Sequence, residues 1–204
     1  MTIDVLLFDL GKVLLDWDPR YFYRQFFAGD DAALERFLAE AAPTDWTLSM
    51  DRGEPVGQAI ARRQREAPEH AALIGRWFEG WPQMLRGEIT DAVGILDAVD
   101  RAGYPIYALT NFSTETWPIA TARCPVLGRF RDVVISGEIG MVKPEPEIYR
   151  HTIERCGLDP ARTLFIDDLA VNVQAARECG LNAVQFTSAQ RLQTDLAAHG
   201  VGLQ

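Results

Sequence analysis

The first residues of the chain form a short apolar run that ends on an acid. Asp4-Val5-Leu6-Leu7-Phe8-Asp9 carries aliphatic and aromatic side chains without helical spacing, and Gly11 follows almost at once. Such a run is typical of a buried strand in a parallel sheet. Because open α/β sheets bind their ligands at the carboxyl ends of the strands, we expect Asp9 to lie at a ligand-binding edge.

A second apolar run with an acidic end lies far down the chain. Residues 163–166 are apolar apart from the first, and Asp167 and Asp168 follow them. If the two strands are neighbours, three carboxylates meet in one crevice, where they repel one another unless a cation is near. Carboxylate oxygens suit a divalent cation. A structural turn is an equal alternative for Asp9 alone, and a solvated turn is the alternative for the acidic pair.

The composition is that of a soluble enzyme. The 204 residues carry a formal net charge of -9 and no run rich in lysine or arginine, which argues against DNA or RNA as a partner. No apolar segment is long enough to cross a membrane, and no basic stretch precedes an apolar run at the N-terminus. Cys124, Cys156 and Cys179 are far apart, which predicts reduced thiols. We therefore expect a cytoplasmic protein.

Two kinds of pattern divide the chain. Between about Asp18 and Leu85, apolar residues recur three or four positions apart, with helix starts predicted at residues 18–19, 30–31, 54–55 and 68–69. After Leu85, expected helices over 90–101, 145–156 and 170–179 alternate with expected strands over 105–110, 133–136, 163–167 and 182–186. The fold class is therefore α/β: a Rossmann-like parallel-sheet core of residues 1–15 and 86–204, with an inserted helical-bundle cap of residues 16–85.

Four motifs, in this order, resemble those of the haloacid dehalogenase-like hydrolase superfamily, subfamily I with a helical cap. Asp9 matches the family's nucleophile, Thr110 and Asn111 its second motif, Lys143-Pro144 its third and Asp167-Asp168 its acidic fourth. The residues around them are also similar to a bacterial branch that contains sugar-phosphate phosphatases of the α-glucose-1-phosphate type. Taken singly, Thr110 would be a strand-end hydroxyl and Lys143 a solvated loop residue, so only the combination indicates a site.

The resemblance implies a phosphomonoester hydrolase that acts on a small phosphorylated metabolite, with a sugar phosphate as the expected substrate. Asp9 would attack phosphorus and form an aspartyl-phosphate. Mg²⁺ would lie between Asp9, the backbone carbonyl of Gly11 and Asp168, and Asp167 would support this set.

The same resemblance assigns the phosphate oxygens to three further residues. Thr110, Asn111 and Lys143 would bind them, and Lys143 would also offset the carboxylates. Asn172 lies four residues after Asp168. It is expected either to orient the metal-binding loop or to be an ordinary exposed residue of a helix's first turn.

One position departs from the family pattern. Most phosphatases of the superfamily have a second Asp two residues after the nucleophile, which protonates the leaving oxygen and later activates water; here that residue is Gly11. General acid/base catalysis contributes about 10²- to 10⁴-fold, so its loss favours an activated ester such as a sugar 1-phosphate. Asp16 is a candidate replacement, whereas Asp18 is better explained as a helix cap before Pro19. Lys12, where the superfamily usually has Gly, either reaches the substrate or faces solvent.

Two other functions compete with phosphate-ester hydrolysis. The 2-haloacid dehalogenases of the same superfamily also lack the second Asp and need no metal, but they generally lack the acidic pair, so Asp167-Asp168 favours phosphoryl transfer. A catalytically silent domain that binds a phosphorylated ligand or a protein partner is the other alternative.

The tryptophans of the predicted cap bear on the substrate. Trp17, Trp46, Trp77 and Trp81 are expected mostly in the core, with one or two at the mouth of the pocket, because aromatic faces suit sugar rings.

Overall fold

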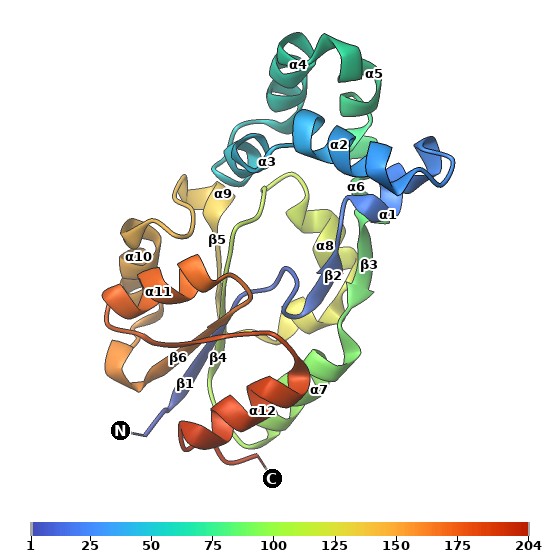
Figure 1. Ribbon diagram of the computed structural model, residues 1–204. Coiled ribbons are helices and arrows are strands. Elements are labelled where there is room, and N and C mark those ends of the chain that lie inside the picture. The colour runs from blue at the N-terminus through green and yellow to red at the C-terminus, as the bar shows by residue number, and fades with distance from the viewer. Residues whose placement is uncertain (1, 204) are drawn as a thin grey trace.

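The structure is a computed structural model that describes residues 2–203. Five parallel strands form the central sheet in the order β5-β4-β1-β6-β7 (Figure 1). The strands are β1 (Val5–Phe8), β4 (Ile106–Thr110), β5 (Val133–Ile135), β6 (Thr163–Asp167) and β7 (Asn182–Gln185). The predicted α/β class with a parallel sheet is confirmed. The chain leaves the central strand β1 and later continues to either side of it, which is the arrangement that opens a crevice at the carboxyl ends.

Helices cover both faces of the sheet, which explains the unbroken apolar run of β1. Leu6 and Phe8 pack in one cluster with buried residues of α7 and α12, whereas Leu7 packs in a second cluster with those of α10 and α11. Successive side chains of a strand point to opposite faces, so both faces of β1 are buried. The helices of this part are α7 (Thr90–Arg101), α8 (Trp117–Arg123), α9 (Ser136–Ile139), α10 (Pro146–Cys156), α11 (Ala170–Glu178) and α12 (Ala189–Ala198), with short 3₁₀ helices η3 (Pro125–Arg129) and η4 (Pro160–Arg162).

The segment between β1 and the rest of the sheet is helical. We call residues 20–84 the helical insert; it lies beyond the carboxyl ends of the strands, at the top of Figure 1. Its elements are α1 (Arg20–Tyr23), η1 (Arg24–Phe26), α2 (Asp31–Ala41), α3 (Thr44–Asp51), α4 (Val56–Glu66), η2 (Pro68–His70), α5 (Ala71–Ile74) and α6 (Trp77–Met84). The division into a core and a cap at residues 16 and 85 stays a prediction.

Two short strands that the sequence pattern did not predict stand at the ends of the insert. β2 (Leu15–Trp17) pairs antiparallel with β3 (Leu85–Glu88). Each is only three or four residues long, too short for an alternating pattern to be visible. The chain therefore enters and leaves the insert through one paired ribbon.

Helix starts in the insert follow the predicted signals with two exceptions: α3 begins at Thr44, where no start was predicted, and the helix predicted from residue 68 is not continuous. The Asp30 carboxylate accepts a hydrogen bond of 2.8 Å from the Ala33 N–H and so caps α2. The Asp18 carboxylate likewise accepts from the Arg20 N–H at 2.8 Å. The single helix expected from residue 68 is instead divided into η2, α5 and α6. Gly75 stands at the end of α5, and only proline is a weaker helix former than glycine.

The insert and the sheet share one apolar interior. Phe22 and Trp46 of the insert belong to the same buried cluster as Leu6 and Phe8 of β1. The indole N–H of Trp46 donates to the Ala59 carbonyl at 2.9 Å, so its polar atom is satisfied inside the insert.

Two further observations bear on the composition. All three cysteines carry free thiols, as predicted. Among residues 2–203, no helix combines the length and the apolar character that crossing a membrane requires.

Candidate active site

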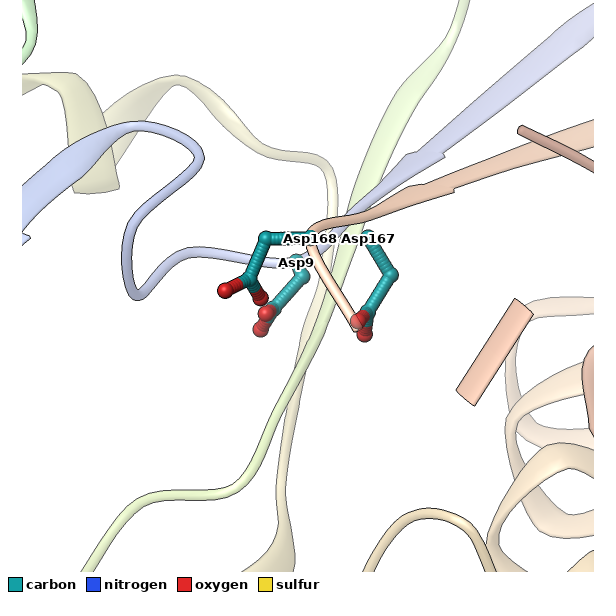
Figure 2. Close-up of side chains that lie close together, drawn as sticks. All are labelled: Asp9, Asp167 and Asp168. Carbon is teal, nitrogen blue, oxygen red and sulfur yellow. The ribbon is translucent and has the colours of Figure 1, made fainter. Parts of the chain in front are cut away.

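Three carboxylates meet at the carboxyl ends of β1 and β6. Figure 2 shows Asp9, Asp167 and Asp168 gathered at this edge, and one carboxylate oxygen from each lies within 4.8 Å of the others. The two strands are direct neighbours in the sheet, and the Asp9 N–H donates to the Ile166 carbonyl at 2.8 Å. Asp9 and Asp167 are buried, and Asp168 is partly buried. The crowding expected from the two acidic strand ends is therefore present.

Lys143 lies between two of these carboxylates. It belongs to the loop between α9 and α10, and its side chain is buried. The ammonium Nζ is 2.8 Å from Asp9 Oδ1 and 2.7 Å from Asp167 Oδ2, and it also donates to the Leu109 carbonyl at 3.1 Å. Burial by itself lowers the pKa of Lys143, but the two carboxylates outweigh it and raise the pKa. The lysine is therefore a fixed positive charge in the site.

Asp167 is held on both of its oxygens. Oδ1 accepts from the Leu169 N–H at 2.8 Å, and the Asn172 amide donates to both oxygens at 3.0 Å. Asn172 is buried in the first turn of α11, so it is not an exposed residue of that turn. Its partner is Asp167 rather than Asp168. Because Asp167 is held by these hydrogen bonds, its own contact with Lys143 fixes the position of the ammonium.

Burial disfavours the charged forms of Asp9 and Asp168, and the crowding of the acids adds to this effect. Burial raises the pKa of Asp9 to about 7, although the Lys143 ammonium lowers it. Burial and the neighbouring Asp167 also raise the pKa of Asp168. One ammonium faces three carboxylates, an excess of two negative charges. A divalent cation would remove this excess.

The second motif differs in part from expectation. Thr110 ends β4, beside β1, and is buried. The Asn111 amide, however, is occupied on both sides by the main chain of Lys143: its oxygen accepts from the Lys143 N–H at 2.8 Å and its nitrogen donates to the Lys143 carbonyl at 3.0 Å. Asn111 therefore positions the loop that carries Lys143, and the expectation that its amide binds phosphate stays a prediction. Sequence spacing could not reveal this, because the two residues are 32 positions apart.

Two of the supporting candidates, Lys12 and Asp16, lie outside the acidic cluster. Lys12 is exposed in the turn after β1, where its charge opposes the rise in the pKa of Asp168. Asp16 lies on β2 and accepts a hydrogen bond of 2.7 Å from the Tyr21 hydroxyl. Asp16 lines neither of the two cavities between the sheet edge and the insert that are described in the next paragraph. Asp16 is therefore a poor replacement for the missing acid.

A small cavity opens between the sheet edge and the insert. It has a volume of about 110 Å³ and is lined by Gly11, Leu15, Trp17, Asp51, Trp81, Leu85, Asn111, Phe112 and Thr116. A second cavity of about 120 Å³ shares four of these residues with it, namely Trp17, Asp51, Trp81 and Thr116, and adds Trp77. Three of the four tryptophans singled out in the sequence thus face the cavities, and Trp46 is in the core.

Asp51 is the acidic residue of this cavity that sequence analysis missed. It is the last residue of α3, and its carboxylate lies close to the main chain of Ser113. Burial raises the pKa of Asp51 to about 7; Lys143 lowers it and Asp9 raises it. Nothing in the local sequence shows where the end of a helix in the insert points. Gly53, two residues on, was the one available signal of a close approach.

Comparison with known proteins agrees with this fold. The family model of the haloacid dehalogenase-like hydrolases matches residues 3–180, and the chain belongs to this family. It is therefore a hydrolytic enzyme. Flavin mononucleotide hydrolase 1 of Arabidopsis thaliana is 25% identical over 98% of this chain and 79% of its own length. N-acetylmuramic acid 6-phosphate phosphatase of Pseudomonas aeruginosa is 24% identical over 88% of this chain and 80% of its own length.

Solved structures give the same picture. The magnesium complex of a haloacid dehalogenase family enzyme from Bacteroides thetaiotaomicron has a TM-score of 0.71 and 26% identity, over 91% of this chain and 94% of that one. A dehalogenase solved as an intermediate complex has a TM-score of 0.73 at 19% identity, over 96% and 98% of the two chains. At that identity the second likeness shows the fold alone.

Proposed function

We propose that this enzyme is a Mg²⁺-dependent phosphomonoester hydrolase that acts through an aspartyl-phosphate on Asp9. The observation that carries the proposal is the cluster of Asp9, Asp167 and Asp168 with Lys143 between two of them. A site that must hold a dianionic phosphate needs more positive charge than one ammonium provides. The similarity to N-acetylmuramic acid 6-phosphate phosphatase and to the magnesium complex from Bacteroides thetaiotaomicron supports this proposal.

The donor set fits Mg²⁺. Asp167 already accepts from Lys143, Asn172 and the Leu169 N–H, whereas within residues 2–203 no side chain donates a hydrogen bond to the Asp168 carboxylate. Asp9, Asp168 and the backbone carbonyl of Gly11 would hold the ion, and Asp167 would support them through Lys143. When bound, Mg²⁺ neutralises the carboxylates and the phosphate.

The remaining roles belong to residues of the chain. The second Asp9 oxygen is the nucleophile, and it stays ionised because Lys143 and the ion offset burial. We expect the Thr110 hydroxyl to donate to the phosphate oxygens. The Lys143 ammonium would stabilise the negative charge that spreads over these oxygens during transfer, and to donate to one of them it would give up one of its three present acceptors, Asp9, Asp167 and the Leu109 carbonyl. Asn111 and Asn172 act through Lys143 and Asp167 and are positioning residues.

The substrate class is a small phosphorylated metabolite, and we propose a sugar phosphate. Trp17, Trp81 and Phe112 line the cavity, and aromatic side chains suit the apolar face of a sugar ring. One relative is a phosphatase of a sugar phosphate. The two cavities between the sheet edge and the insert of this enzyme are smaller than the several hundred Å³ usual for drug-sized ligands, which favours a small leaving group.

The test is phosphate release from sugar phosphates, nucleotides and acyl phosphates, with Mg²⁺ or EDTA, beside a chloride-release assay on 2-chloropropionate. We expect Mg²⁺-dependent phosphate release that EDTA abolishes. Asp9→Asn should be inactive with an unchanged circular dichroism spectrum, because the volume hardly changes. Metal-independent chloride release would instead identify a dehalogenase. Inactivity on every substrate would favour a silent binding domain.

A further inference from the structure

Gly11 stands where the family resemblance places a general acid, and the space beside it is open. A Cβ atom built on Gly11 meets nothing within 4 Å, and Gly11 is not among the glycines with positive φ. The core therefore presents no side chain where most relatives have a carboxylate. Across the same cavity, the insert presents one carboxylate, that of Asp51.

The end of α3 is attached to the core by a buried hydrogen bond and a close main-chain contact. The buried Ser136 hydroxyl donates to the Asp51 carbonyl at 2.5 Å and accepts from the Phe112 N–H at 2.9 Å. Gly53 has a φ of +99°, and a Cβ atom there would lie 3.0 Å from the Gly137 carbonyl oxygen. These contacts fix the main chain on both sides of the Asp51 side chain.

The Asp51 carboxylate also lacks the partner that a structural acid would have. Within residues 2–203 it forms no ion pair; its neighbour Arg52 is paired with Glu145 at 2.5 Å. The charged groups that act on it are Lys143 and Asp9, both of the active site. The main chain of Ser113 lies close to the Asp51 carboxyl group and opposes the rise in its pKa, and a carboxyl group can both donate and accept a proton.

From this geometry we propose that Asp51 is the proton donor and acceptor of the reaction, in place of the side chain that Gly11 lacks. The inference rests on the proposed phosphatase function. As Asp9 forms a bond to phosphorus and the ester P–O bond breaks, the Asp51 carboxyl gives its proton to the leaving oxygen. Its carboxylate then takes a proton from water, whose oxygen attacks phosphorus and breaks the bond to Asp9.

The proposal changes the expected substrate range. With a proton donor present, the enzyme is not confined to activated esters, and the wild-type rate should depend only weakly on leaving-group acidity. The pKa of Asp51, which burial raises to about 7, agrees with both halves of this role near neutral pH.

The experiment compares Asp51→Asn with Asp45→Asn, an exposed acid in the first turn of the same helix. With an alkyl phosphate such as glycerol phosphate, kcat/KM of Asp51→Asn should fall by about 100-fold or more. With 4-nitrophenyl phosphate, whose leaving group needs no proton, kcat/KM should stay within about 3-fold, and a burst of one nitrophenolate per enzyme should precede slow turnover. Asp45→Asn should match the wild type.

Two further variants separate a chemical role from a structural one. Asp51→Glu keeps a carboxyl group and should retain most activity on the alkyl phosphate. Gly11→Asp combined with Asp51→Asn should restore alkyl-phosphate turnover, because the cavity has room at Gly11. An equal loss on both substrates without rescue would overturn the proposal, as would unchanged kinetics. A wild type that hydrolyses no phosphate ester would refute the phosphatase function itself, and the proposal with it.

Discussion

Lys12 occupies a backbone conformation that residues with a side chain rarely adopt. Its φ is +58°, in the left-handed region, within a turn in which its N–H donates to the Leu15 carbonyl at 2.8 Å. Glycine adopts this region without strain, which agrees with the glycine that the family resemblance implies at this position. The backbone conformation of Lys12 thus follows from the path of the chain around the nucleophile loop.

Replacing Lys12 tests this reading. Lys12→Gly should be more stable than Lys12→Ala by about 1 kcal/mol, because only glycine relieves the strained φ. This reverses the usual order, in which glycine is the less stable of the two. Urea denaturation of both variants gives the comparison. An alanine variant as stable as the glycine variant would show that the turn is unstrained.

At the scale of elements, two of the polar contacts that link the end of α3 to the core should contribute differently to the free energy of unfolding. Ser136→Ala removes a buried hydroxyl that bonds the Asp51 carbonyl and the Phe112 N–H, and should cost about 1–3 kcal/mol. Arg52→Ala breaks an exposed pair with Glu145, and such pairs contribute about 0–1 kcal/mol. Chemical denaturation of both variants measures this; a greater loss in Arg52→Ala would contradict it.

The helices and strands also show which features of the fold and of the site could be predicted from the sequence. The parallel strands were predicted to within one residue at either end, because each is an apolar run bounded by turn residues. The strand-end rule and the family motifs together brought Asp9, Lys143 and Asp167 to one edge. Asp51 escaped because its place depends on how the insert packs on the sheet, which no local pattern encodes. The Asn111 contact escaped for the same reason: it joins two loops that meet only in the folded chain.

The whole molecule should respond to Mg²⁺ through the acidic cluster. A ligand at about ten times its Kd adds about 1.4 kcal/mol to the free energy of unfolding, so Mg²⁺ should raise the Tm. Asp168→Asn should abolish this shift. In EDTA the same variant should be at least as stable as the wild type, because burial and Asp167 disfavour the charged form of Asp168. An identical Mg²⁺ shift in the variant would place the ion elsewhere.

The pH dependence of stability should reveal Asp51. Burial raises the pKa of Asp51 from 3.8 to about 7. The contribution of Asp51 to the free energy of unfolding is therefore fully present below about pH 4 and is lost as the pH rises through 7. Carboxylates paired with arginines, such as Asp132, have lowered pKa values and act in the opposite direction. The comparison with Asp51→Asn in EDTA isolates the effect: the variant should gain stability relative to the wild type between about pH 4 and 7, by at most about 4 kcal/mol. A constant difference would contradict the raised pKa.

The central claim is that Asp9 carries the phosphoryl group. Rapid acid quench of Asp51→Asn during turnover of 4-nitrophenyl phosphate, followed by borohydride reduction, converts an aspartyl-phosphate to homoserine, which peptide mass spectrometry can place. We predict homoserine at position 9, and none without substrate or in Asp9→Asn. Turnover with no modification at position 9, under conditions that show the nitrophenolate burst, would contradict the covalent mechanism.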